Sequence, residues 1–430
     1  MSFSVLDLND INLRVVKDKQ RLLDSPGYAV IKDNQIAFGT TAEKLKRIHP
    51  RNTHDDYWYR LSQDPIQSAS SQIRHNADLA FMHLSEIFEH TGKNADWLIA
   101  VPANFSQEQL ALFLGLLKAE DIKNVILVDS ALLTTSNSML QGDYRYLDIQ
   151  LHQIIISRLN SNDSKRVISS ETFTGIGILK IYDQCAKIMS DEFINQSRFD
   201  PHHNAETEQL LYETIPECLK QLNTAAVTTV NIKYHNKVHQ AIIKRELVMA
   251  LFRRLFEVVL QKIDASMPVI LNHRLHSLPG ISEMIENAIL LDEDSLFDAA
   301  LKYTDFLQAT DASANYINTL PVLAGDSIEK PNALSVKQKN NITHVLINNC
   351  ALKLNAAKCY FDGNHELNEN LTDNTCYSIH HSDDQYFLQT ENSRTIFLNE
   401  NAVAEKSLLA LGDTISTDLT KPLATFIRVK

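Results

Sequence analysis

The spacing of apolar and polar positions predicts short strands at the start of the chain. Up to about residue 60, apolar runs alternate with polar turns: SVLDL (4–8), INLRVV (11–16), GYAVIKD (27–33) and NQIAFG (34–39). Short runs of this kind between turn residues are typical of β-strands, and a helix is expected over 41–48. We therefore expect SVLDLNDINLRVV to form two strands around a tight turn at Asn9-Asp10.

The next stretch has the pattern of a strand–helix–strand unit. Residues 66–91 place apolar side chains at helical spacing, which predicts a core-facing helix. The apolar runs at 97–101 and 125–129 predict buried strands, and Ser106 and Glu108 mark the start of a helix between them. A strand, a crossover helix and a second buried strand favour a parallel sheet that is covered on both faces.

Residues 143–180 repeat the opening pattern. YRYLDIQLHQIIISRL (144–159) again predicts two strands, which turn after an acidic residue, Asp148. Helices are expected at 176–195, 205–222, 245–263 and 277–290, and strands at 228–235, 238–244 and 268–273. The chain thus has two halves, each of which begins with a strand pair that turns near an aspartate.

A third region follows a change in composition. Ala, Asn, Ser, Pro and Lys dominate residues 311–342, which predicts a linker. Beyond it, seven short apolar runs between Asn, Asp and Gly residues predict an all-β domain. The expected domains are therefore 1–310, α/β in class, and 343–430, a small β-sandwich.

Charge and composition exclude several classes of protein. The net charge of −12 and the scattered Lys and Arg residues argue against nucleic-acid binding. No apolar run reaches the roughly 18 residues of a membrane span, and the first residues lack the pattern of a secretory signal, so we expect a cytoplasmic protein without membrane insertion. Five widely spaced cysteines and the His202-His203 and His380-His381 pairs do not indicate a metal site.

Glycine is scarce, and this bears on phosphate binding. The chain has 11 glycines in 430 residues, about a third of the usual share. Loops that cradle phosphate need glycine, because only a residue without a side chain lets backbone N–H groups close around the anion. The only closely spaced pair, Gly175 and Gly177, lacks the spacing of a dinucleotide or Walker loop.

Four segments together resemble the seventy-kilodalton heat-shock chaperones (heat shock protein 70), whose ATPase domain shares its fold with actin and sugar kinases. They are NQIAFGTTAEKLKRIHPRNT (34–53), DWLIAVPANFSQEQLALFLGLLKAEDIKNVILVDSALLTT (96–135), FTGIGILKIYDQCAKIMSDEF (173–193) and PVILNHRLHSLPGISEMI (268–285). They occur in the family's order over roughly residues 3–306. The resemblance implies a duplicated, ribonuclease H-like fold of two lobes around a nucleotide cleft.

The chain departs from that family at each glycine loop that holds the nucleotide. The family grips phosphates with two glycine-bearing hairpins and adenosine with a Gly-Gly pair. The corresponding positions here retain both aspartates but no glycine: Asp7, Asn9 and Asp10; Asp148, Gln150, Leu151 and His152; and Asn272, His273 and Arg274. We expect these side chains to fill the space that a triphosphate needs, with His152, His273 and Arg274 plugging the cleft.

Two catalytic positions also differ. The family's catalytic lysine corresponds to Tyr59 and its catalytic glutamate to Asp129. Tyrosine supplies no positive charge to a transferring phosphoryl group, and such transfer relies mainly on electrostatic stabilisation. The resemblance therefore implies a degenerate nucleotide cleft without catalytic or metal-binding residues.

The C-terminal region resembles the second half of forkhead-associated domains. Phe397, Leu398 and Asn399 match one strand motif of that family, and Leu409, Gly412, Asp413 and Ile415 match the next. The Gly-Arg and Ser-x-x-His pieces that hold phosphothreonine in the family correspond to Leu354-Asn355 and Thr372-Asp373-Asn374. An arginine and oriented hydroxyl groups capture phosphopeptides, and these pieces do not supply them.

Our leading hypothesis from the sequence is a non-catalytic, heat-shock-protein-70-like scaffold that binds an unidentified protein partner and no cofactor. Its β domain would supply a second binding surface. One alternative is a divergent ATP-binding chaperone that uses ATP and Mg²⁺ with Asp7, Asp129 and Asp148 around the metal. Another is an adaptor that reads phosphopeptides through residues 345–430.

Overall fold

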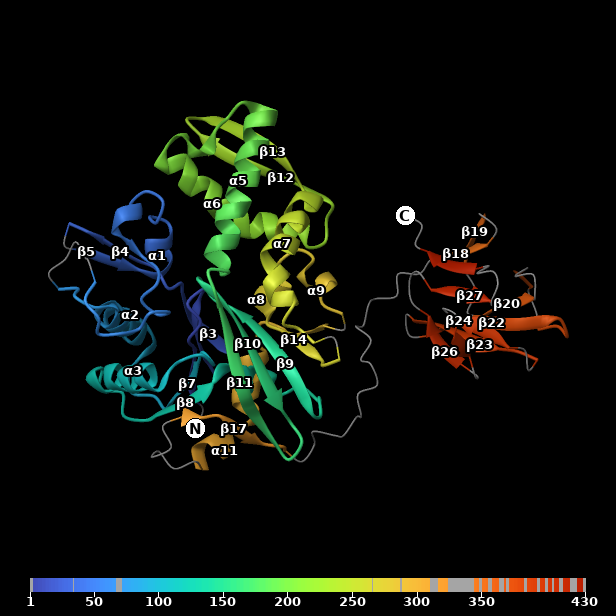
Figure 1. The fold of residues 1–430 in the computed structure, drawn as a ribbon, viewed down its shortest axis with the longest axis horizontal. Coiled ribbons are helices and arrows are strands. Elements are labelled where there is room, and N and C mark those ends of the chain that lie inside the picture. The colour runs from blue at the N-terminus through green and yellow to red at the C-terminus, as the bar shows by residue number, and fades with distance from the viewer. Residues whose placement is uncertain are drawn as a thin grey trace. The chain divides into compact units, whose positions relative to one another are not determined.

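The computed structural model divides the chain into two units, residues 1–333 and 334–430. It describes most of the first unit and the strands of the second (Figure 1). The described residues are 3–33, 35–66, 72–264, 266–286, 288–309, 316–323, 344–347, 350–354, 358–362, 367–368, 371–382, 385–392, 395–398, 401–403, 406–409, 413–417 and 424–427.

The first unit is a mixed α/β structure with two six-stranded sheets. In the first sheet, β1 pairs antiparallel with β2 and parallel with β7, and β7 continues in parallel to β8. The order is β16-β8-β7-β1-β2-β3, with bounds β1 (Ser4–Asp7), β2 (Leu13–Lys17), β3 (Gln20–Ser25), β7 (Trp97–Val101), β8 (Val125–Asp129) and β16 (Tyr316–Ile317).

The second sheet repeats this arrangement. Here β9 pairs antiparallel with β10 and parallel with β14, which continues in parallel to β15. The order is β15-β14-β9-β10-β11-β17, with bounds β9 (Asp143–Ile149), β10 (Gln153–Asn160), β11 (Ser164–Thr174), β14 (Val269–Leu271), β15 (Ala288–Leu290) and β17 (Thr319–Pro321). Each sheet therefore has a central strand whose carboxyl end carries one of the two turn aspartates, Asp7 or Asp148.

Smaller elements complete the first unit. A three-stranded sheet has the order β5-β4-β6, and β12 and β13 form a two-stranded sheet; their bounds are β4 (Ala29–Lys32), β5 (Gln35–Phe38), β6 (Thr53–His54), β12 (Val227–Tyr234) and β13 (Lys237–Lys244). The helices are α1 (Gly39–Glu43), α2 (Asn76–Thr91), α3 (Gln107–Ala119), α4 (Ser130–Thr135), α5 (Ile178–Ser197), α6 (Ala205–Leu222), α7 (Arg245–Leu260), α8 (His273–His276), α9 (Ile281–Met284), α10 (Ser295–Lys302) and α11 (Thr304–Ala309), with short 3-10 turns at Pro50–Asn52 and Pro201–His203. None of the helices among the described residues is long and apolar enough to cross a membrane.

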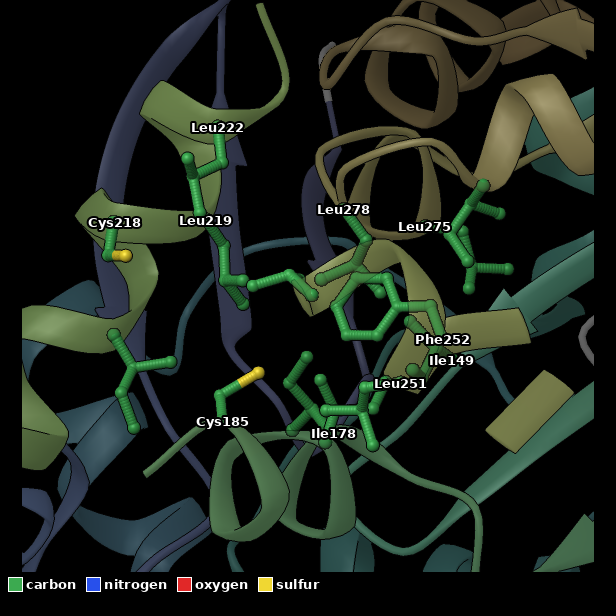
Figure 2. Packing of buried hydrophobic residues seen from close by; sticks show 14 of the residues in the cluster. Ile149, Ile178, Cys185, Cys218, Leu219, Leu222, Leu251, Phe252, Leu275 and Leu278 are labelled. Atoms are coloured by element: carbon green, nitrogen blue, oxygen red, sulfur yellow. The ribbon is translucent and has the colours of Figure 1, made fainter. Parts of the chain in front are cut away.

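The largest hydrophobic cluster lies among α5, α6, α7 and the second sheet (Figure 2). Cys185 on α5 and Cys218 on α6 are buried in it as free thiols, together with Phe252 of α7 and Ile149 of β9. The amphipathic spacing of these helices explains the cluster, because each turns one apolar face inward. The cluster fixes α5 against the turn between β9 and β10.

The structure corrects three predictions of secondary structure. The helix expected over 277–290 ends at Met284, and Ala288–Leu290 instead forms β15, since these residues extend the sheet beside β14. The helix expected over 41–48 is the short α1, which ends at Glu43. Strand β3 was not expected, because most of its side chains are exposed; a turn with positive φ at Asp18 and Lys19 folds it back onto β2.

The parallel pairing expected from the strand–helix–strand unit is confirmed for β7 and β8. The strand pairs expected at the start of each half, β1–β2 and β9–β10, pair antiparallel around their turns. The expected linker, 311–342, is wrong for its first part. Residues 316–317 pair with β8 in the first sheet, and residues 319–321 pair with β11 in the second. These short apolar strands find partners at two sheet edges. Residues 311–315 and 324–342 of the expected linker lie outside the described residues.

The second unit has two sheets that share one hydrophobic cluster. Their orders are β19-β18-β28-β27-β24-β25 and β21-β20-β22-β23-β26. The bounds are β18 (His344–Ile347), β19 (Cys350–Lys353), β20 (Lys358–Asp362), β21 (Leu367–Asn368), β22 (Thr375–Ser382), β23 (Gln385–Thr390), β24 (Ile396–Leu398), β25 (Asn401–Val403), β26 (Lys406–Leu409), β27 (Thr414–Ser416) and β28 (Ala424–Ile427). Asn355, Asn399 and Gly412 lie outside the described residues.

Gly177 offers a test of the contact between α5 and the second turn. A Cβ at Gly177 would lie 2.2 Å from the carbonyl oxygen of Leu151, a backbone atom that cannot move alone. We expect Gly177→Ala to lower the free energy of unfolding by about 1–3 kcal/mol. Gly115→Ala is the matched control, because Gly115 is an exposed residue of α3 and an added Cβ would meet no described atom within 4 Å. This substitution is expected to be neutral or stabilising. Equal unfolding midpoints in urea for both variants would contradict the close contact.

Candidate functional site

The turn after β1, the turn after β9 and the start of α8 meet at the carboxyl ends of the central strands. They bring together most of the site residues that the sequence indicated. Among the described residues, a small cavity of about 10 Å³ lies between them, lined by Asp7, Arg14, Ser130, Thr134, Tyr146, Asp148, Asn272, His273, Arg274, Asp292, Glu293 and Leu296. This volume is about the room of one water molecule.

Asp7 is the centre of a buried ion-pair cluster. One of its carboxylate oxygens, Oδ2, accepts hydrogen bonds from Arg14 at 2.9 Å and from Arg274 at 2.8 Å. All three side chains are at least nine-tenths buried. Burial opposes the ionisation of Asp7, but the nearby guanidinium groups of Arg274 and Arg14 lower its pKa to about 2. The carboxylate is therefore charged and neutralised by the protein's own cations.

Asn9 connects the turn after β1 to strand β9 of the second sheet. Its side-chain Nδ2 donates to Asp148 Oδ2 at 3.1 Å and to the carbonyl oxygen of Ile149 at 3.0 Å. Its Oδ1 accepts from the backbone N–H of Ile11 at 3.0 Å. Burial raises the pKa of Asp148 to about 6, although the charge of Arg274 acts in the opposite direction. A glycine at position 9 would make none of these side-chain contacts.

Asp10 places a carboxylate on the backbone of the second turn. Its Oδ1 accepts from the N–H of Leu151 at 2.8 Å, and its buried Oδ2 has no hydrogen-bond partner within the described part of the chain. Burial raises the pKa of Asp10 to about 6, while the hydrogen bond from Leu151 acts in the opposite direction. Because the Leu151 amide already has an acceptor, it is not available to an external anion.

His152 and Tyr59 lie at the rim of this cluster. The His152 ring nitrogen Nε2 contacts the carbonyl oxygen and Oδ1 of Asp55, at 3.0 and 3.1 Å. Burial alone would lower the pKa of His152, but the hydrogen bond to Asp55 raises it. The Tyr59 ring stacks on the His152 ring with centroids 5.6 Å apart. Tyr59 therefore makes an aromatic contact at the expected position of a catalytic lysine.

The start of α8 supplies the third side of the cluster. Asn272 caps this short helix, with its Oδ1 accepting from the N–H of Arg274 at 2.9 Å. This turn directs Arg274 toward Asp7 and leaves His273 beside the cavity. Burial lowers the pKa of His273 to about 2, and the charges of Arg274 and Arg14 contribute. His273 is therefore neutral at physiological pH.

Two of the indicated residues have other roles. Asp129 accepts from the N–H of Leu132 at 3.1 Å and from the hydroxyl of Tyr316 at 2.9 Å. Its neighbour Ser130, rather than Asp129 itself, is among the described residues that line the cavity. Burial raises the pKa of Asp129 to about 6. Gln150 is buried and bonds Gln153 across the second turn.

A wider hollow of about 470 Å³ is lined in part by Leu151 and His152. Two of the three cations that line it, Arg47 and Lys46, have partners, whereas Lys180 forms no ion pair with the described residues. Arg47 pairs with Asp183 at 2.5 Å and stacks on the Tyr212 ring, and Lys46 contacts the Tyr28 hydroxyl at 3.1 Å. Among the described residues, no group of three or more His, Cys, Asp or Glu side chains is arranged to hold a metal ion.

The sequence analysis missed Arg14, which pairs with Asp7 across the first hairpin. The available signal was a single charge inside the otherwise apolar strand LRVV. Glu293, which accepts from Arg14 at 3.3 Å, and Asp55 were also missed. Nothing in the local pattern of these two acids marks them, because each comes from a distant part of the chain.

A scan against protein-family models found no match to this chain, and a search of curated proteins found no significant match.

Removal of Arg274 should destabilise the protein strongly. Arg274→Met leaves the buried Asp7 carboxylate with one cation fewer, and breaking a buried pair in this way typically costs about 3–5 kcal/mol. Arg21→Met is the matched control, because Arg21 is 40% exposed in its pairs with Glu293 and Asp24, where about 1 kcal/mol or less is at stake. Urea unfolding at neutral pH measures the free energy of unfolding of both variants. Equal losses in the two variants would show that the buried Asp7 cluster contributes no more to stability than an exposed ion pair.

Asp10 should make stability decrease as the pH rises. Its pKa is raised from 3.8 to about 6 in the folded protein, so its contribution is complete below pH 3.8 and is lost as the pH rises through 6. Between pH 4 and 7, the free energy of unfolding of Asp10→Asn should fall by on the order of 2 kcal/mol less than that of the wild type. Asp33→Asn, an exposed position with a positive φ that suits asparagine, serves as control. Identical pH slopes for wild type and Asp10→Asn would refute the assignment.

Proposed function

We propose that residues 3–306 adopt an actin-like ATPase fold, resembling heat shock protein 70, in which side-chain contacts have replaced nucleotide binding. The protein would act in the cytosol as a non-catalytic, partner-binding subunit. Five strands of each sheet share one order and the same pairing directions, β8-β7-β1-β2-β3 in the first and β15-β14-β9-β10-β11 in the second, which supports a duplicated fold. The aspartates at the ends of the two central strands support the correspondence with that fold.

The observation that carries the proposal is that the protein's own side chains pair with Asp7 and with the backbone N–H of Leu151. Arg274 provides a cation to Asp7, and Asp10 provides an anion to the Leu151 amide. In a nucleotide-binding hairpin pair, a hydrated metal ion and phosphate oxygens would take these places. Asn9 and Arg274 also fill the space, which leaves about 10 Å³.

The energetic cost of admitting a nucleotide supports the same conclusion. ATP–Mg²⁺ would have to separate Arg274 from Asp7 in a buried site, at a cost of about 3–5 kcal/mol. Micromolar binding corresponds to about 8 kcal/mol in total. A cost of about 3–5 kcal/mol for separating the ion pair would weaken nucleotide binding by about 10²–10⁴-fold, into the millimolar range.

The C-terminal unit belongs to the proposal as a second binding surface, with a forkhead-associated-like architecture. Its loop at 372–375 uses its hydroxyl groups internally: Thr372 and Thr375 bond each other at 3.2 Å. Asn392 donates to the carbonyl oxygens of Thr372 and Thr375, at 3.0 and 2.9 Å. These contacts favour a protein-binding surface over a phosphothreonine pocket.

Isothermal titration with ATP–Mg²⁺ tests the proposal directly. We expect no saturable heat at nucleotide concentrations up to about 100 µM, because the Asp7–Arg274 pair excludes the ligand. A parallel assay of phosphate release should show no hydrolysis above the buffer rate. Saturable micromolar binding would overturn the proposal, and hydrolysis that disappears in Asp148→Ala would establish the alternative of a divergent ATPase.

A further inference from the structure

The two-stranded sheet of β12 and β13 has one face without a covering element among the described residues. A two-residue turn at His235 and Asn236, both with positive φ, closes this hairpin. Its side chains alternate regularly between the two faces. The inner face, which includes Val230, Ile232 and Ile243, packs into the cluster with α5 and α6.

The outer face carries exposed β-branched side chains. Val227, Val238 and Ile242 are each at least half exposed, and Thr229 lies directly opposite Ile242 on this face. β-Branched side chains at alternate positions suit an extended neighbour strand, because they pack against its side chains across the pleat.

The two edges of this sheet differ in their hydrogen-bond partners. The edge of β13 is closed by Gln196 of α5, which accepts from the N–H of Ile242 at 2.8 Å and donates to its carbonyl oxygen at 3.0 Å. No strand of the described residues pairs with the outer edge of β12. An open edge that presents backbone donors and acceptors is a template for another strand.

The register identifies the open groups. Because the backbone of Ile242 points away from β12, the pair Thr229–Ile242 is not hydrogen-bonded within the hairpin. In an antiparallel ladder, hydrogen-bonded and non-hydrogen-bonded pairs alternate along the strands. The pair Asn231–Gln240, two residues farther along, is therefore also not hydrogen-bonded within the hairpin. The N–H and carbonyl groups of Thr229 and Asn231 therefore point outward from the β12 edge.

The hairpin is basic in an acidic protein. Residues 227–244 contain three lysines and no Asp or Glu, whereas the whole chain has a net charge of −12. Lys233 on the outer face and Lys237 beside the turn are exposed and form no ion pair with the described residues. Lys244, at the other end, is 3.8 Å from Glu246. The local charge complements an acidic segment.

We propose that the β12 edge binds an extended, acidic segment of a partner protein, which adds to the hairpin as a third strand. This inference rests on the proposed function, since it names the surface and the partner chemistry of a partner-binding subunit. Backbone groups of Thr229 and Asn231 supply the affinity, and Lys233 and Lys237 select acidic side chains.

The experiment uses the full-length protein and a fluorescein-labelled peptide of alternating glutamate and valine, followed by fluorescence anisotropy. We expect saturable binding that weakens as salt increases, and slower hydrogen exchange at the amides of Thr229 and Asn231. A peptide of alternating lysine and valine should bind at least about tenfold more weakly.

Asn231→Pro removes one outward N–H from the β12 edge and should weaken peptide binding about tenfold. Gln240→Pro is the matched control, because it lies opposite on the closed side and should change binding less than twofold. Thermal unfolding of both variants checks that they are folded. Lys233→Glu with Lys237→Glu provides a second variant that leaves the backbone edge intact and should also weaken binding.

Three results would overturn the inference. They are absence of peptide binding at about millimolar concentration, equal effects of the two proline variants, and equal binding of a single-stranded oligonucleotide that Asn231→Pro does not affect. The last would show attraction to any polyanion without strand addition. Because ATP titration does not involve this hairpin, a failure here leaves the non-catalytic assignment intact, and nucleotide binding would remove that assignment independently.

Discussion

Arg274 brings a positive charge to the buried carboxylate of Asp7, and much of the first unit is arranged around this contact. The arginine lies in the short helix α8 after β14 of the second sheet, whereas the aspartate ends β1 of the first. The pair therefore holds the two sheets together at the ends of their central strands. Arg14 shares the same carboxylate oxygen and continues to Glu293, so the charge is compensated on more than one side.

Around this pair, two side chains of the first turn contact the second half. Asn9 of the first half contacts Asp148 and Ile149 of the second, and Asp10 contacts Leu151. The side chains of Asn9 and Asp10 do more than occupy volume. They form hydrogen bonds between parts of the chain that are 139 to 141 residues apart in sequence.

Local pattern was sufficient for the strand pairs at the start of each half and for the long helices α3, α5, α6 and α7. It also indicated α2, but that helix begins at Asn76 and not at residue 66, because His75 instead bridges to Pro65. Local pattern failed for β3 and β15. Strand β3 is mostly exposed, and β15 exists only because β14 offers it an edge. The meeting of Asp7, Asp148 and Arg274 was indicated by the resemblance to a family, whereas the partners Asp55 and Glu293 depend on tertiary placement that no local pattern encodes.

The segment 316–321 has a mechanical consequence. Within six residues the chain adds β16 to an edge of one sheet and β17 to an edge of the other, and it then leads toward the second unit. Tension on the second unit would therefore reach β17 before any other described strand of the first unit. Separation of β17 from β11 would break the hydrogen bonds of this short pairing one at a time. The segment therefore connects the two sheets and would be the first described part of the first unit to separate under tension.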